Sequence, residues 1–174
     1  MPWAGLPPDY ASRSCELRAL KQLERHLYRI QRSAGYNYDV VDVFPDRHDF
    51  ENAGGNFPVC NLVMGVDEVL NASDIDRSLN VEVHRAVVHL DWILSDAEPS
   101  VARGKLKADL LKYFGQDYNY MLPENDDGSA PSCFNFMFSS FTPYGDDQQK
   151  PTCTLQMEAF LWWRTTLGNP YQLN

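Results

Sequence analysis

The chain has 174 residues, a formal net charge of −9 and 44% hydrophobic residues, which fits a single acidic domain with its own core. It has no run of Lys or Arg that could displace counterions from phosphates, so we expect neither specific nucleic-acid binding nor binding to an anionic membrane. No stretch approaches about 18 uninterrupted apolar residues, so the sequence predicts no membrane-spanning helix.

The first 13 residues are Pro-rich and read as an N-terminal arm, so we place one domain over 14–174. The arm lacks a basic region followed by an apolar run, which predicts no signal peptide and residence in a cytosol. After a cap at Ser12 or Ser14, apolar residues recur at helical spacing. The spacing predicts an amphipathic helix over 14–33 that ends near Gly35, with an apolar face of Leu17, Leu20, Leu23, Leu27 and Ile30.

Three strands are predicted next, over Asp39–Phe44, Val59–Leu70 and Val81–Leu94. A polar loop from Asp46 to Phe57 separates the first two. In the third, alternation puts Leu90, Trp92 and Leu94 on the core side.

Ser95 or Asp96 is expected to cap a second helix that ends at Gly115. Its predicted apolar stripe consists of Val101, Leu106, Leu110, Leu111 and Phe114. A long polar loop, Gln116–Ala130, follows, and a loop of this length is either functional or mobile.

The last third predicts a long β-hairpin of Ser132–Thr142 and Thr152–Thr165, followed by a turn at Gly168–Tyr171. One face of the first strand carries Phe134, Phe136 and Phe138. One face of the second carries Cys153, Leu155, Met157, Ala159, Leu161 and Trp163. The fold class is therefore α+β, in the order α-β-β-β-α-β-β, with two helices on one face of a mixed, mainly antiparallel sheet of about five strands.

The other face of the last strand carries Phe160 and Trp162 beside Glu158 and Arg164. Large aromatic residues mixed with charges are typical of a protein interface. The alternative is a sheet that the chain itself covers on both sides.

No signature of an enzyme or metal protein stands out. The cysteines, Cys15, Cys60, Cys133 and Cys153, form no Cys-x-x-Cys pair, so we expect buried, reduced thiols, three of them in strands. His84 and His89 are five residues apart on one strand and point to opposite faces, which disfavours a shared metal. We expect no cofactor, metal or catalytic residue, although a pair of carboxylates distant in sequence is left open.

The chain resembles the tail-terminator proteins of long-tailed bacteriophages over residues 14–171. The resemblance rests on the order of elements, the helix Glu16–Leu20, the strand opening Phe57–Cys60 and the strand Val81–Leu94 followed directly by a capped helix. The ending adds to it, with Glu158–Arg164 and then Asn169-Pro170-Tyr171.

The resemblance implies a non-enzymatic virion protein, assembled in the host cytoplasm, that forms a ring of six copies on the head-proximal end of the tail tube. The ring would stop tube polymerisation. Its implied partners are the tail-tube protein, a neck or head-completion protein and, in a contractile tail, the sheath. The expected interface residues are Arg47, Asp49, Phe50, Asn125, Asp126, Phe160, Trp162 and Arg164. Another neck or minor tail connector of the same fold, and a small α+β enzyme or ligand-binding domain, are the alternatives.

Overall fold

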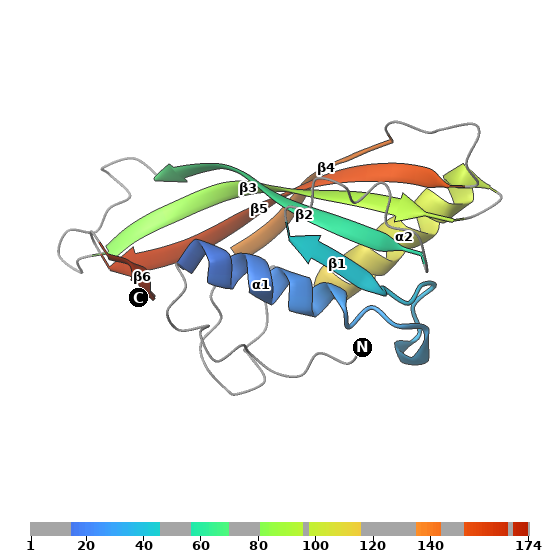
Figure 1. The fold of residues 1–174 in the computed structure, drawn as a ribbon, viewed down its shortest axis with the longest axis horizontal. Coiled ribbons are helices and arrows are strands. Elements are labelled where there is room, and N and C mark those ends of the chain that lie inside the picture. The colour runs from blue at the N-terminus through green and yellow to red at the C-terminus, as the bar shows by residue number, and fades with distance from the viewer. Residues whose placement is uncertain are drawn as a thin grey trace.

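A computed structural model of the chain describes residues 15–45, 57–69, 81–95, 98–115, 135–143, 152–166 and 169–173. The helices are α1 (Cys15–Leu27) and α2 (Pro99–Phe114), with a short 3-10 helix, η2 (Arg32–Ala34). The strands are β1 (Asp42–Pro45), β2 (Val59–Val69), β3 (Val81–Leu94), β4 (Asn135–Thr142), β5 (Cys153–Thr166) and β6 (Asn169–Leu173) (Figure 1). The predicted α+β class and order of elements are confirmed, with one strand added at the end.

The strands form one twisted sheet in the order β1-β2-β3-β5-β4, with β6 also paired to β5 (Figure 1). The predicted hairpin of β4 and β5 is antiparallel, as are β2–β3 and β3–β5. Among the described strands, β1 and β2 are the one parallel pair. The predicted mixed, mainly antiparallel sheet is confirmed, and its parallel pair is possible because the connection from Pro45 to Val59 is long enough to return the chain to the end where β1 began.

The two longest strands pair along their whole length, from Val81 opposite Thr166 to Leu94 opposite Cys153. The predicted bounds of β3 are confirmed. β4 covers only part of the other side of β5, and β6 pairs beyond it, with Asn169 opposite Thr166. The predicted turn at Gly168–Tyr171 is therefore wrong from Asn169 onward, where the chain adds a strand to the uncovered end of β5.

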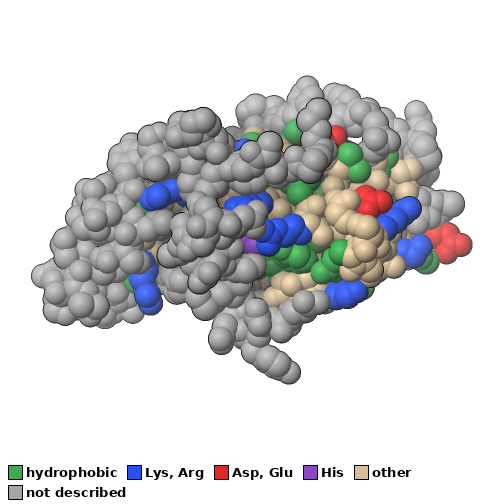
Figure 2. Space-filling view, turned by 90° about the horizontal axis from the view of Figure 1, so that it is seen from below, with side chains coloured by type: hydrophobic (Ala, Val, Ile, Leu, Met, Phe, Trp, Pro, Cys, Tyr) green, Lys and Arg blue, Asp and Glu red, His purple; other side chains and the backbone are tan. Residues whose placement is uncertain are grey.

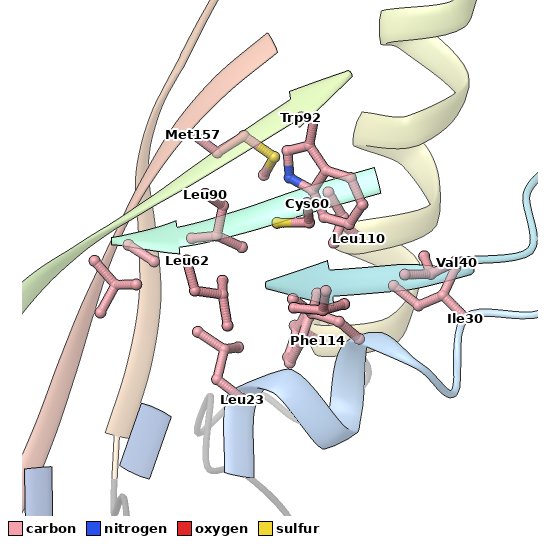
Figure 3. Packing of buried hydrophobic residues seen from close by; sticks show 14 of the residues in the cluster. Leu23, Ile30, Val40, Cys60, Leu62, Leu90, Trp92, Leu110, Phe114 and Met157 are labelled. Atoms are coloured by element: carbon pink, nitrogen blue, oxygen red, sulfur yellow. The ribbon is translucent and has the colours of Figure 1, made fainter. Parts of the chain in front are cut away.

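Both helices lie against the same face of the sheet and bury one core with it (Figure 3). In β3 every second residue from Ala86 to Leu94 is buried, and in β5 every second residue from Cys153 to Trp163. The predicted core faces of both strands are thus confirmed, since alternation is enforced by the pleat. In β4, a bulge between Phe138 and Ser140 lets Phe141 also pack against this core.

The first helix is shorter than predicted. It ends at Leu27, and η2 follows, closed by Gly35 at φ 86°. The Gln31 side chain explains the early end, because its amide donates to the carbonyls of Tyr28 (2.9 Å) and Val40 (3.0 Å) and turns the chain back toward β1. Ile30 is buried although it lies beyond the helix, whereas Leu17 is 48% exposed and lies outside the core.

The predicted apolar stripe of the second helix is confirmed for Leu106, Leu110 and Phe114, which are buried, and wrong for Val101 and Leu111. Glu98 occupies the N-cap position and Pro99 the first turn, so a cap at Ser95 or Asp96 is wrong. Val101 and Leu111 are 41% and 43% exposed. The residues that face the sheet are Ala102, Leu106, Asp109, Leu110 and Phe114.

Three cysteines, Cys15, Cys60 and Cys153, are free and buried. Two of them lie in strands and Cys15 begins α1, while Cys133 falls outside the described residues. Neither described helix has the length and apolar character needed to span a membrane.

Candidate protein interface

One face of the sheet, which we call the open face, is covered by neither described helix. It is the side of β3 and β5 opposite the core, joined by neighbouring positions of β2 and β4. Its central residues are only half-buried, unlike those of the helix-covered face. At one end of this face, Val59 and Ile93 are buried in a second small cluster with Phe44 and Phe57. The part of the open face that is left for contact is therefore the part over β3, β5 and β4.

The apolar half of the open face crosses three strands. Val87, Phe160 and Met137 are direct neighbours across β3, β5 and β4. The rings of Phe160 and Trp162 are 5.7 Å apart, and Met137 is 41% exposed. Aromatic residues and Met in one surface patch are the composition that protein interfaces favour.

Arginines frame this apolar half. The guanidinium of Arg85 lies 5.3 Å from the centre of the Phe160 ring, a cation–π contact, and Arg85 is also the cross-strand neighbour of Trp162. Arg164 is exposed at the far end of the same row on β5. Trp and Arg together are the residues most enriched at the energetic centres of interfaces.

The other half of the open face is polar and internally bonded. The Gln156 amide donates to Asp91 at 2.8 Å, and the Ser140 hydroxyl to Glu158 at 3.1 Å. Nδ1 of His89 lies 3.7 Å from the Glu158 carboxylate, close enough for an ion pair when the imidazole is protonated. Gln156 with Asp91 and Ser140 with Glu158 thus bond across strands, as groups in the polar rim of an interface do, whereas His89 Nδ1 makes no hydrogen bond to the described residues.

Of the eight residues predicted for the interface, the structure brings three together. Phe160, Trp162 and Arg164 share the open face of β5, in the alternation that predicted them. The others, Arg47, Asp49, Phe50, Asn125 and Asp126, lie outside the described residues. The alternative, a second side covered by the chain itself, holds at the β1–β2 end of the face, where Val59 and Ile93 are buried with Phe44 and Phe57. Over Phe160 and Trp162 no described helix covers the sheet.

The structure separates His84 from His89, as predicted. His84 is buried on the helix-covered face, stacks on Trp163 with ring centres 5.4 Å apart and bonds Thr165 at 3.0 Å. His89 lies on the open face. Among the described residues no group of three or more His, Cys, Asp or Glu is placed to hold a metal ion.

A comparison with protein-family models finds no match, and neither does a comparison with curated proteins. The geometry of the open face therefore carries the functional argument.

Sequence reasoning missed Arg85, Val87 and Met137 as members of the candidate interface. Alternation along each strand gives its two faces, but only the register shows which residues of β3 and β4 stand beside Phe160 and Trp162. Strand length does not specify which strands pair, so no signal in the sequence placed these three residues beside Phe160 and Trp162.

Proposed function

We propose that this protein is a non-enzymatic assembly protein that binds other protein chains through the open face of its sheet. The observation that carries the proposal is the difference in burial between the adjacent side chains of Trp162 and Trp163. Trp163 is buried under the helices, whereas Trp162, one residue earlier, is half-buried among Phe160 and arginines on the face that no described helix covers. Two adjacent tryptophans in one strand thus serve two different surfaces.

More specifically, we propose a virion role as the protein that caps the head-proximal end of a phage tail tube. The support is the resemblance to tail-terminator proteins, which rests in part on an order of helices and strands that agrees with the observed order. A cap must stop tube growth, so it has to match the tube end with one surface and offer a different one to the neck. A ring of identical copies has two different sides, one for the tube end and one for the neck. Within the ring, each copy covers its neighbour's exposed face.

The test mixes the purified protein with its own tail-tube protein and images the products by electron microscopy. The expected result is tubes of limited length, each with a distinct terminal ring. Tubes that lengthen without a ring would contradict capping and favour a different connector in the neck or tail. A monomer in dilute solution alone does not decide the matter, because the tube end can serve as the template for the ring.

A matched pair of variants ties this assay to the open face. Phe160→Ser with Trp162→Ser should abolish terminal rings while the protein still folds, as circular dichroism would show. The control is Met137→Leu, which keeps an apolar side chain on the same face and should leave capping intact. If the double variant fails to fold, those residues belong to a core and the interface proposal is wrong.

A further inference from the structure

The charge on the open face of β5 changes sign from one end of the strand to the other. Along the strand, the residues on this face are in turn Glu158, Phe160, Trp162 and Arg164. The Glu158 side chain is 40% exposed, Arg164 is exposed, and the two aromatic residues between them are half-buried. Because alternate residues of a strand share a face, this one row carries an acidic end, an apolar centre and a basic end.

The neighbouring strands follow the same order. Val87 on β3 and Met137 on β4 flank the apolar centre. On β3, Arg85 lies toward the basic end and Asp91 toward the acidic end. At the acidic end His89 is charged only when its imidazole is protonated. The separation of charge is therefore a property of the open face across two strands, with the apolar centre continued on a third.

This pattern is complementary to itself when two β5 strands run in opposite directions. Consider a two-fold axis between two such faces, across the strands and level with the midpoint of Phe160 and Trp162. The axis brings Glu158 of each copy opposite Arg164 of the other, and Phe160 opposite Trp162. With the strands parallel, Glu158 would instead oppose Glu158 and Arg164 would oppose Arg164, and like charges disfavour that arrangement. Charge thus selects the antiparallel arrangement of two sheets packed about 10 Å apart.

Another surface of the molecule does not show this arrangement. In the view from below, Lys and Arg side chains predominate on the described part of the surface, and Asp and Glu are sparse (Figure 2). A surface with mainly one sign of charge gains little from facing a second copy of itself. The open face, with opposite charges on either side of an apolar centre, is the better match for its own copy.

We propose that the open face of the free chain binds the open face of a second copy, with the β5 strands antiparallel and Glu158 of each copy paired with Arg164 of the other. The contact covers Phe160 and Trp162, which would otherwise stay in contact with water. A two-fold dimer has two equivalent sides, so it is not the cap itself, and it must open before the same face is used on a tube. The inference rests on the proposed role of the open face in assembly and names the partner that holds this face beforehand.

The test reverses each charge of the pair in a separate variant and then mixes the two variants. Glu158→Arg gives a face with Arg at both ends, and Arg164→Glu gives a face with Glu at both ends. Either variant alone would oppose two pairs of like charges, whereas one copy of each would form two pairs of opposite charges. Self-association of the whole chain, without tube protein, is measured by sedimentation velocity at about 50 mM salt, where charges are weakly screened.

Wild type should sediment as a dimer at about 100 µM. Each single variant should dimerise at least about tenfold more weakly, and the equimolar mixture should dimerise within about threefold of wild type. Native mass spectrometry should find one copy of each variant in that dimer, because the two chains differ in mass. Lys105→Glu is the matched control, since it changes the net charge as Arg164→Glu does but lies exposed on α2, and it should dimerise like wild type.

Thermal melting checks the fold of each variant, because Glu158 also accepts a hydrogen bond from Ser140 of its own chain at 3.1 Å. If Glu158→Arg melts early, Glu158→Gln takes its place, since the amide oxygen keeps an acceptor for Ser140 and the charge is removed. Mixed with Arg164→Glu, this variant still forms one pair of opposite charges. The mixture should then dimerise more tightly than Arg164→Glu alone.

Three results would overturn the inference without touching the tail-capping proposal. The first is a wild-type protein that stays monomeric at about 100 µM and low salt. The second is wild-type dimerisation of either charge-reversed variant. The third is weakened dimerisation of both variants that mixing does not restore, which would mean that Glu158 and Arg164 do not meet. Tubes that lengthen without a terminal ring, beside a dimer that behaves as expected, would contradict the capping role alone.

Discussion

The carboxylate of Asp109 on α2 binds Asn37 at three points. It accepts the Asn37 backbone N–H at 3.0 Å and 2.9 Å with its two oxygens, and the Asn37 side-chain amide at 2.7 Å. A further bond comes from the backbone N–H of Tyr38 at 3.0 Å. Asp109 is buried, so this one side chain satisfies the backbone of the loop before β1 and fixes that loop to a helix 72 residues away in sequence.

Asp109→Ala should therefore destabilise the protein by about 3 kcal/mol, because it leaves the buried N–H of Tyr38 and the part-buried N–H of Asn37 without their acceptor. Chemical denaturation monitored by tryptophan fluorescence measures the change. Asp42→Ala is the control, since Asp42 is an exposed acid at the start of β1, and it should shift the free energy of unfolding by about 0.5 kcal/mol or less. Equal effects of the two substitutions would contradict the assigned role.

The adjacent tryptophans of β5 give a second prediction. Trp163→Ser should cost about 3–5 kcal/mol or prevent folding, because Trp163 fills the core and stacks on His84. Trp162→Ser should cost about 1 kcal/mol and leave a folded chain that assembles poorly. Thermal melts of both variants measure the two stability changes, and the capping assay measures whether Trp162→Ser still assembles. The assignment of the two faces fails if Trp162→Ser is the more destabilising.

Alkaline pH should destabilise the fold through its tyrosines. Burial raises the pKa of Tyr28 and of Tyr113 above the ordinary value of 10.0. The folded protein thus holds these protons more tightly than the unfolded chain, so the stabilisation is complete below about pH 10 and is lost as pH rises through the folded pKa values. Absorbance of tyrosinate should rise at higher pH in the native protein than in denaturant. Coincident titration curves would contradict this.

The buried thiols should not react with alkylating reagents in the folded state. Burial raises the pKa of the Cys60 thiol well above its ordinary range, and Cys15 and Cys153 are also buried, so none of the three should be alkylated at pH 8. In denaturant, all 4 cysteines of the chain should react. Mass spectrometry of alkylated protein counts them. Two thiols missing after denaturation would indicate a disulfide and a different redox compartment.

Local pattern determined much of this fold. Alternation alone identified the core faces of Val81–Leu94 and of the last long strand, because a pleated strand offers only two faces and burial selects the apolar one. The same alternation put Phe160, Trp162 and Arg164 together on the opposite face.

Only the tertiary structure decided the features that depend on partners distant in sequence. The end of α1 at Leu27 is set by contacts of Gln31 with Tyr28 and Val40, whereas the apolar spacing continued to Ile30. On α2, buried Asp109 replaces Leu111 in the face toward the sheet, because the loop at Asn37 supplies the hydrogen bonds that make a buried carboxylate tolerable. Spacing along a chain records which residues are apolar. Which of them meet, and which remain exposed for another protein, is fixed by strand register and by hydrogen bonds between elements.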